Sequence, residues 1–248
     1  MLGLGLVAGV LGGLLGIGGG TLVVPGLVFF FAFGQHRAHG TSLVVALMLA
    51  TSGVLTYALH GEVNAIIALE IAAGGVIGAI FGASAANAIK GRVLRRIFSV
   101  FLILVAIRMI YAGLYPNSCS TTPAFANGSL PMAMLVVGVG ILTGFMSALL
   151  GIGGGVVMVP AMVMLLGIAQ KSAHGISLAA MMPTAFTGIL MHCARGNVDF
   201  RVGGWVGLGA AVGAFCGALA AVNLDACTLR LIFAIFLILM SALMAAKK

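Results

Sequence analysis

The chain has 248 residues, of which 62% are hydrophobic and only 6% are charged, and its mean hydropathy is +1.27. Soluble domains carry about 25% charged residues, so this composition excludes an ordinary soluble domain and indicates a protein that crosses a membrane several times. Its 12 Lys and Arg outnumber its 4 Asp and Glu, but the basic residues stand at the ends of apolar segments, where they set membrane orientation, and we expect no nucleic-acid partner.

The first apolar segment, residues 2–33, is interrupted by glycines. It contains a Leu-Leu-Gly-Ile-Gly-Gly-Gly motif at residues 14–20, followed by Pro25. Each glycine in a helix costs about 1 kcal/mol relative to alanine, so this run should break the helix. Broken backbone survives in a bilayer only where it is buried in protein or lines a cavity. The segment could cross once with an unwound centre, or turn at the glycines and return to its side of entry.

Three further apolar segments complete the first half of the chain, at residues 41–59, 63–89 and 93–114. Each is long enough to cross a membrane as one helix. Residues 115–131, which contain three prolines and several Ser, Thr and Asn, are predicted to form a linker.

The second half repeats the first without gaps at an offset of 135 residues. The glycine motif recurs at residues 149–155, followed by Pro160, and glycines four residues apart occur at matching places in both halves. Glycines with this spacing let helix backbones approach closely, and we predict tight packing there. The matching apolar segments are 132–168, 176–194, 198–222 and 228–246. The sequence therefore predicts an all-α membrane protein with two homologous repeats, residues 1–114 and 132–248.

The distribution of basic residues favours a returning first segment. If that segment crosses, 7 Lys and Arg lie on one side and 4 on the other; if it returns, the division is 9 against 2. Because basic residues concentrate on the cytoplasmic side, we favour the returning hairpin. Each repeat then crosses three times, and an odd number makes the two repeats inverted, with both termini cytoplasmic and the linker external.

The glycine motifs are the first candidate binding elements. Consecutive backbone N–H groups in a tight turn form a concavity for anions, and the start of a returning helix adds its positive dipole end. The alternative is that the glycines only let the hairpin pass close to its neighbours. The candidate substrate-binding residues of this set are Gly18, Gly19, Gly20, Gly153, Gly154 and Gly155.

An Ala-His-Gly-x-Ser pattern is the second candidate. It supplies His39 and Ser42 in one half and His174 and Ser177 in the other, and we expect each serine to be the N-cap of a helix. Helix starts with a nearby imidazole bind oxyanions, and a histidine can also carry a proton.

Other polar residues in or beside the apolar segments complete the candidates. Gln35 and Gln170 precede the two patterns, and either contact substrate or hydrogen-bond the loop backbone. Glu70 and Arg108 lie inside predicted spans, where an ionisable group is a functional candidate. Together with His39 and His174 they are candidates for ion coupling, although a salt bridge or snorkelling would explain Glu70 and Arg108 equally well. The four cysteines show no metal or disulfide spacing and are expected to pack as small apolar residues.

The duplicated Gly-x-Gly-Gly-Gly…Val-Pro motif, with the Ala-x-Gly-x-Ser-Leu pattern after it, resembles the TauE/SafE sulfite-exporter family over essentially the whole chain. The resemblance implies a secondary transporter for small sulfur-containing anions such as sulfite, sulfonates or related organic acids. It implies functional roles for Gly16 and Gly151, for the two prolines, for the glycines named above, and for Ser42 and Ser177. The histidines at 39 and 174 depart from the family pattern, which leaves the substrate open.

The leading hypothesis is a transporter in the bacterial inner membrane that works by alternating access and holds the anion between the two glycine breaks. Such a protein needs the lipid bilayer and a small anion, with H⁺ or Na⁺ as the open choice of coupling ion, and no metal or cofactor. Its oligomeric state stays open. The alternative is a metal-cation permease that uses the 14 Met and 5 His residues. An intramembrane enzyme is a third reading, because Ser177 lies one turn from His174, but no motif for a nucleophile surrounds them.

Overall fold

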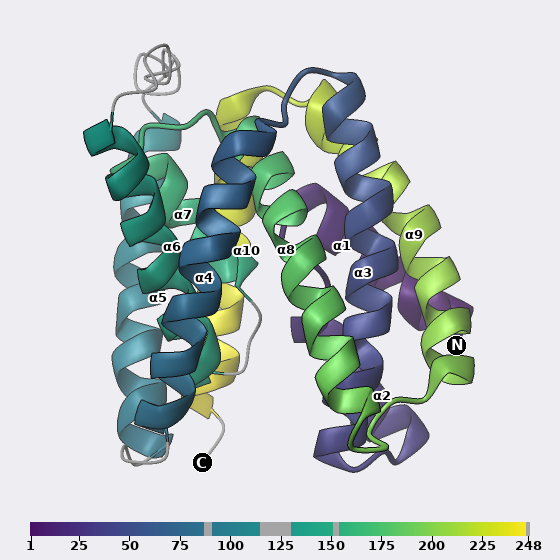
Figure 1. Cartoon of the computed structure of the whole chain (residues 1–248). Helices are drawn as coiled ribbons and strands as arrows, with labels where there is room; N and C mark the ends of the chain where they lie inside the picture. Colours follow the sequence, from purple (N-terminus) through teal and green to yellow (C-terminus); the bar gives the residue numbers. More distant parts are fainter. Residues whose placement is uncertain (87–90, 115–129, 151–153, 247–248) are drawn as a thin grey trace.

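Residues 1–86, 91–114, 130–150 and 154–246 are described by the structure, a computed structural model (Figure 1). The described residues form helices and no strands. The helices are α1 (Leu2–Leu15), α2 (Gly20–Phe31), α3 (Gln35–Leu59), α4 (Ala65–Ala86), α5 (Gly91–Leu114), α6 (Leu130–Leu150), α7 (Gly155–Leu165), α8 (Gln170–Cys193), α9 (Phe200–Asn223) and α10 (Ala226–Ala246).

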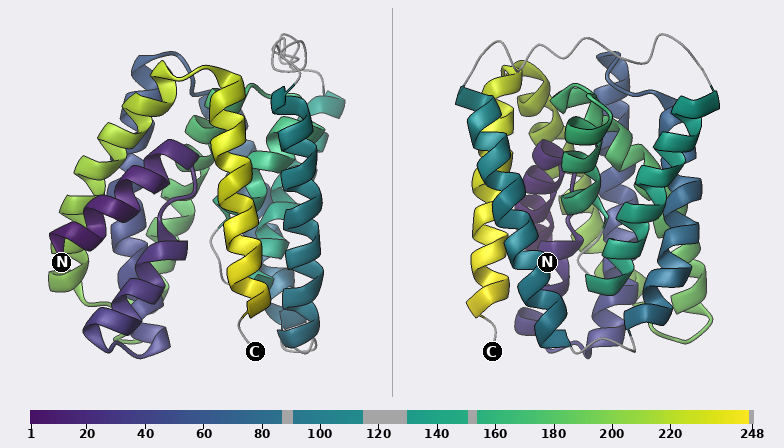
Figure 2. Two further views of the ribbon diagram at one scale, coloured as in Figure 1. Left: turned by 180° about the vertical axis from the view of Figure 1, so that it is seen from behind. Right: turned by 90° about the vertical axis from the view of Figure 1, so that its left-hand side faces the viewer.

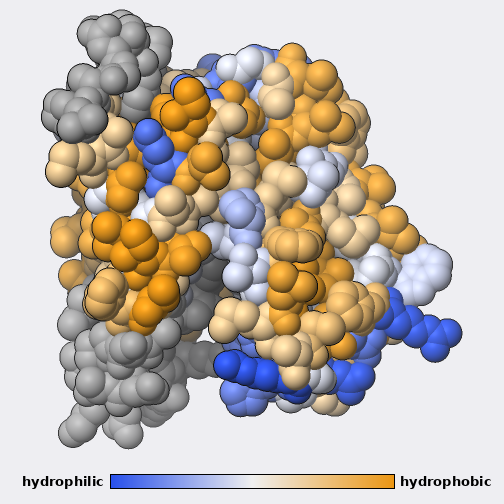
Figure 3. Space-filling model, in the orientation of Figure 1, coloured by the Kyte–Doolittle hydropathy of each residue, from blue (hydrophilic) through white to orange (hydrophobic). Residues whose placement is uncertain are grey.

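Five of these helices, α3, α4, α8, α9 and α10, contain an apolar stretch long enough to cross a membrane. The predicted all-α membrane protein with several crossings is thereby confirmed. The space-filling view shows mainly hydrophobic side chains across the middle of the molecule (Figure 3). Large apolar side chains such as Phe29 and Phe30 are 78% exposed, which suits contact with lipid tails.

The first segment breaks at the predicted glycines and folds back on itself. Gly16, Gly18 and Gly19 all have positive φ, between 66° and 71°, a conformation that favours glycine. The helices on either side lie against each other, because a Cβ built on Gly26 of α2 would lie 2.5 Å from the side chain of Leu4 in α1. From the N-terminus α1 therefore runs to the break and α2 runs back, as the rear view shows (Figure 2).

Helices α3 and α8 begin six residues earlier than predicted. Their N-caps are Gly34 and Ala169, which have extended backbone, whereas the sequence prediction placed the helix starts at residues 41 and 176. Gly40 and Gly175 lie in these additional helical residues. They remain helical because the loop of the other half packs there: a Cβ at Gly40 would overlap the carbonyl oxygen of Asn197, and one at Gly175 would lie 2.8 Å from that of Glu62.

Each hairpin packs against a long helix of the other half. Helix α1 lies along α9, since a Cβ at Gly213 would overlap the carbonyl oxygen of Leu6. Helix α6 lies along α4 in the same way, with Gly78 against Ile141, and these two contacts are related by the offset of 135. The predicted tight packing of the spaced glycines is confirmed.

This packing makes Gly78 and Gly75 a matched pair. We expect Gly78→Ala to lower the thermal melting temperature in detergent by about 6 °C or more, because its methyl group would push α4 from the backbone of α6. A Cβ at Gly75 would meet no atom closer than 3.9 Å, so Gly75→Ala should leave the melting temperature unchanged or raise it. Equal melting temperatures for the two variants would contradict the contact.

Equivalent helices of the two halves run in opposite directions where they meet. Gly53 of α3 faces Leu178 of α8, while Gly188 near the end of α8 faces Leu43 near the start of α3. Helices α5 and α10 are also antiparallel, and Ser241 near the end of α10 donates to the carbonyl of Ser99 near the start of the described part of α5 (Figure 2).

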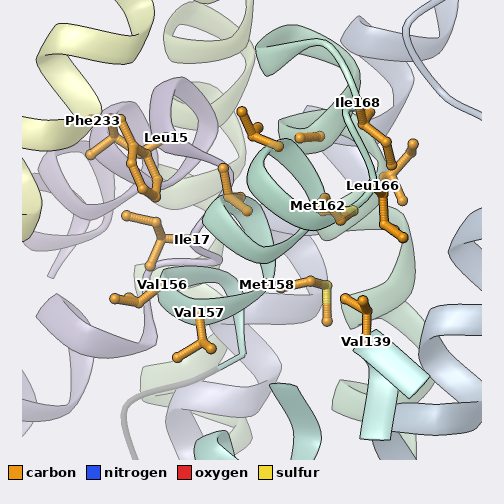
Figure 4. Packing of buried hydrophobic residues seen from close by; sticks show 14 of the residues in the cluster. Leu15, Ile17, Val139, Val156, Val157, Met158, Met162, Leu166, Ile168 and Phe233 are labelled. Carbon is orange, nitrogen blue, oxygen red and sulfur yellow. The ribbon is translucent and has the colours of Figure 1, made fainter. Parts of the chain in front are cut away.

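The two glycine breaks meet at the core of the molecule. A Cβ built on Gly155, at the start of α7, would lie 2.6 Å from both the carbonyl oxygen of Gly16 and the Cα of Ile17. Ile17 packs there with Val156 and with Phe233 of α10, all three 2% exposed or less (Figure 4). The two breaks are therefore in backbone contact, where α1 ends and α7 begins.

One sequence expectation about the cysteines was wrong. Cys227, at the start of α10, is disulfide-bonded, whereas Cys193 and Cys216 are free, so its partner lies outside the described residues. Sequence spacing could not show this bond, because nothing in the local pattern brings the start of α10 close to a distant cysteine.

Candidate functional site

The carbonyl end of α1 is capped by side chains from other helices. Tyr57 of α3 donates its hydroxyl to Gly13 O at 3.0 Å, and Ser177 of α8 donates to Gly16 O at 2.9 Å. Nδ1 of His174 lies 2.9 Å from Leu14 O. These three side chains are fully buried. Each bond therefore satisfies a carbonyl oxygen at the end of α1 that water could not reach.

The contacts of His174 fix its tautomer. Since a carbonyl oxygen can only accept, Nδ1 carries the proton, and Nε2 is left to accept from the Nε2 amide group of Gln170 at 2.8 Å. The ring also stands edge-on to Phe233. Gln170 itself is fully buried, and its Oε1 has no partner among the described residues. His174 and Gln170 therefore form a neutral buried chain that ends on the first break.

The amide side of the break is open by contrast. Gly19 O accepts the N–H groups of Leu22 and Val23, which leaves the N–H groups of Gly19, Gly20 and Thr21 without an acceptor among the described residues. A narrow hollow, too small to admit a water molecule in this conformation, adjoins this turn. Its lining residues are Leu11, Gly12, Ile17, Gly19, Thr21, Leu22 and Phe236.

The second break differs from the first. Gly154 is the N-cap of α7 with ordinary helical φ, and Gly155 contacts the first break as described above. Gly153 lies outside the described residues. Among the described residues, the α3 side chains that match the α8 caps form no hydrogen bond to this break. Ser42 donates to His39 O in its own helix at 2.8 Å, His39 is half-buried, and Gln35 is exposed.

The expected N-cap role of the two serines is therefore wrong. Ser42 and Ser177 lie in the second turns of α3 and α8, and the caps are Gly34 and Ala169. The serines stand too far along the helix for capping, so one hydroxyl turns back to its own helix and the other reaches Gly16 O.

Asp199 secures the start of α3 against the start of α9. As N-cap of α9, its Oδ1 accepts from the N–H groups of Arg201 and Val202, and its Oδ2 lies 2.7 Å from Arg37. The Val202 N–H, together with Arg37, lowers the pKa of the Asp199 carboxyl. The ionised form is thus favoured in the folded protein.

We expect Asp199→Ala to destabilise the fold by about 1 kcal/mol at neutral pH, mostly through loss of the cap. Because folding lowers the pKa, this stabilisation is present above the ordinary value near 4 and disappears as the pH falls through the lower folded value. Melting temperatures of the two proteins should therefore converge at acidic pH. Asp199→Ser keeps a capping oxygen and is the control; a gap that widens in acid would contradict the assignment.

The coupling candidates inside the spans do not pair with each other. Glu70 is partly exposed on α4 and Arg108 is exposed on α5, and no ion pair joins them. Arg108 instead lies close enough to Arg230 for electrostatic repulsion. Among the residues the structure describes, no three His, Cys, Asp or Glu side chains gather as metal ligands would.

Sequence reasoning did not place two residues of this site. They are Tyr57, which bonds to Gly13 O, and Phe236, which lines the hollow beside the break. A usable signal for Phe236 was present, because an aromatic residue occupies the same place in both halves, as Phe101 and Phe236.

Comparison with known proteins matches most of the chain to one family of membrane proteins. The family model described as sulfite exporter TauE/SafE matches residues 1–109 and 135–248. The probable membrane transporter protein YunE of Bacillus subtilis is 30% identical over 234 residues, which cover 84% of this chain and 86% of the relative. A probable membrane transporter protein of Methanocaldococcus jannaschii is 31% identical over 197 residues, covering 76% and 69%. One from Xylella fastidiosa is 30% identical over 217 residues, covering 86% and 81%.

Proposed function

Because the chain belongs to the TauE/SafE sulfite exporter family, we propose that this membrane transporter carries small sulfur-containing anions, such as sulfite or sulfonates, by alternating access. The anion is held at the first glycine break, beside the point where the two breaks meet. The proposal uses no cofactor, and it makes the protein a carrier and not an enzyme.

The capping of the first break is the observation that carries the proposal. The carbonyl oxygens of Gly13, Leu14 and Gly16 are each occupied by a buried donor, so they are not free to coordinate a cation. The amide groups of Gly19, Gly20 and Thr21 have no acceptor among the described residues. A broken helix that presents these free donors, and has these three carbonyl oxygens occupied, suits an anion.

Within this proposal, the α8 residues position the site. His174 and Ser177 have their polar atoms engaged with the backbone of the break, and Gln170 is engaged with His174. They therefore hold the loop in shape, while Gly18, Gly19 and Gly20 contact the substrate. His39, Ser42 and Gln35 stand at the matching place on α3, and Gly154 and Gly155 complete the site from the other repeat.

The opposite directions of α3 and α8 support the inverted-repeat arrangement. The backfolded hairpin of α1 and α2 supports a first segment that enters the membrane and returns without crossing. With three crossings in each repeat, α3 to α5 and α8 to α10, the two halves then have opposite orientations. Rocking of these halves about a central site is the usual route to alternating access in such folds.

The disulfide supports the orientation of the protein. Disulfides persist outside the cytoplasm, so Cys227 at the start of α10 belongs to the external side. The end of α5 and the start of α6 lie at that same end of the molecule, and the C-terminal end of α10 lies at the other (Figure 1). The linker is then external and the C-terminus cytoplasmic, in a bacterial inner membrane.

Thiol labelling checks this orientation. In intact spheroplasts of a Cys193→Ser, Cys216→Ser variant, we expect a membrane-impermeant maleimide to label the protein only after treatment with an impermeant reductant. Labelling without reductant would contradict the presence of the disulfide. Labelling that requires permeabilised cells would place Cys227 on the cytoplasmic side and reverse the orientation.

Flux in proteoliposomes tests the transport function directly. Radiolabelled sulfite and a small sulfonate should move only when the protein is present, with and without an imposed pH or Na⁺ gradient to identify coupling. Cu⁺ and Ni²⁺ flux is measured in parallel for the metal-permease alternative, which uses the Met and His residues. Metal flux with no anion flux would overturn the proposal.

A further inference from the structure

The two halves of the protein make the same interhelical contact to different extents. In one half, Ser52 of α3 donates its hydroxyl to Ala211 O of α9 at 2.7 Å. Nearby, Gly207 of α9 packs so closely on Met48 of α3 that a Cβ would overlap its sulfur. Helices α3 and α9 are thus in contact along their middle.

The offset of 135 places Thr187 of α8 opposite Val76 of α4 as the counterpart of this pair. Here, however, Thr187 is exposed and donates to Pro183 O in its own helix at 2.9 Å. Val76 is 45% exposed. The two helices still contact each other nearer the external end, where Ile67, Ala68 and Ile176 share one core cluster. Helices α4 and α8 therefore diverge toward the other end, as the ribbon view shows (Figure 1).

The side-chain contacts of the two glycine breaks differ between the halves in the same way. Ser177 and His174 of α8 are fully buried on the first break, but their counterparts Ser42 and His39 on α3 bond within α3 or lie half-buried. Nδ1 of His192, the counterpart of Tyr57, is buried without a partner among the described residues. The α3 donors are thus present at the matching positions and have no partner on a break among the described residues.

We propose that the protein has a second conformation in which α4 closes along α8, so that Thr187 donates to Val76 O, while α9 opens from α3 and Ser52 releases Ala211 O. This exchange rests on the proposed alternating access and names the contact that breaks and the contact that forms. The present structure is the state with α3 closed on α9 and the α4–α8 side open at the end where α10 terminates. Because the two repeats share one architecture, each state resembles the other with the halves exchanged.

Cross-linking in membranes tests the second conformation without any substrate. In a Cys193→Ser, Cys216→Ser background, Val76→Cys with Thr187→Cys should form a disulfide on mild oxidation, identified by mass spectrometry of the linked peptides. Ser52→Cys with Ala211→Cys is the positive control, since that contact exists in this structure. Leu69→Cys with Thr187→Cys is the negative control, because the counterpart of Leu69 is Gly204, which has open space around it. A yield for the Val76 pair no higher than that of the Leu69 pair would overturn the proposal.

Each disulfide should also stop flux, and reduction should restore it. The cross-link is read without transport, so failure of sulfite flux with successful Val76–Thr187 cross-linking rejects the proposed substrate and keeps the conformational exchange. Normal anion flux without that cross-link rejects the exchange alone.

Single substitutions provide a second measurement if the double variants fold poorly. Ser52→Ala should lower the melting temperature, because it removes an existing interhelical bond. Thr187→Ala should leave the melting temperature unchanged, since that hydroxyl bonds only to its own exposed helix, yet slow transport about threefold or more. A Thr187→Ala protein with unaltered flux would contradict a role for the second contact.

Discussion

Gly20→Leu is expected to reduce anion flux at least tenfold while leaving the protein folded. Gly20 is the first residue of α2 and lies between Gly19 and Thr21, which both line the hollow. A Cβ at Gly20 would meet no atom within 4 Å. Its φ is not in the left-handed region, so a side chain is compatible with the backbone. Leucine would thus occupy open space at the start of α2, beside the free amide groups, without displacing existing contacts. A tenfold loss of flux corresponds to about 1.4 kcal/mol.

Gly138→Leu is the matched control for this substitution. Gly138 lies within α6, also has nothing within 4 Å of a built Cβ, and lies far from the first break in sequence. Both variants should elute and melt like the unmodified protein, and only Gly20→Leu should lose flux. Undiminished flux in the Gly20→Leu protein would show that the substrate does not bind at the start of α2.

Gly16→Ala is expected to lower the melting temperature by about 10 °C, corresponding to a loss of about 3 kcal/mol or more. Two effects combine at this position. Its φ is +66°, where alanine is strained, and a Cβ there would lie 2.7 Å from the Cα of His174. The break could not then sit against α8, and the bonds from His174 and Ser177 to α1 would be lost with it.

Gly61→Ala separates the two effects. Gly61 has a φ of +73°, but a Cβ there would meet nothing within 4 Å. Its substitution should therefore cost only the backbone strain, about 1 kcal/mol, or about 3 °C. If both variants melted alike, the close approach of the break to α8 would be wrong and strain alone would account for Gly16.

The glycine positions show what the sequence could predict. A run of glycines with a following proline predicts a broken helix from local preference alone, and the break was found at Gly16 to Gly19. The sequence left two roles open for these glycines, ligand contact or close packing. The structure shows which of these glycines pack closely. Gly16 and Gly155 approach other backbone, whereas Gly20 faces open space.

The starts of α3 and α8 show why the remainder could not be predicted. Gly40 and Gly175 lie early in these helices, and local preference places a helix start after them. They are helical because a loop from the other half, which contains Asn197 or Glu62 respectively, packs on the face that a side chain would occupy. Likewise no local pattern tells Ser177, which bonds to the first break, from Ser42, which bonds within its own helix.

The capped break also has an electrical consequence. Its side-chain caps are neutral, and no charged side chain is among the described residues that line the hollow. An anion bound there would be held by dipoles alone, so the loaded carrier would cross the field with the full charge of its cargo. Unless H⁺ or Na⁺ travels with it, each turnover would pass current. A cell interior at −100 mV would then favour outward movement of a monoanion by about 2.3 kcal/mol, so that the resting voltage alone could power export.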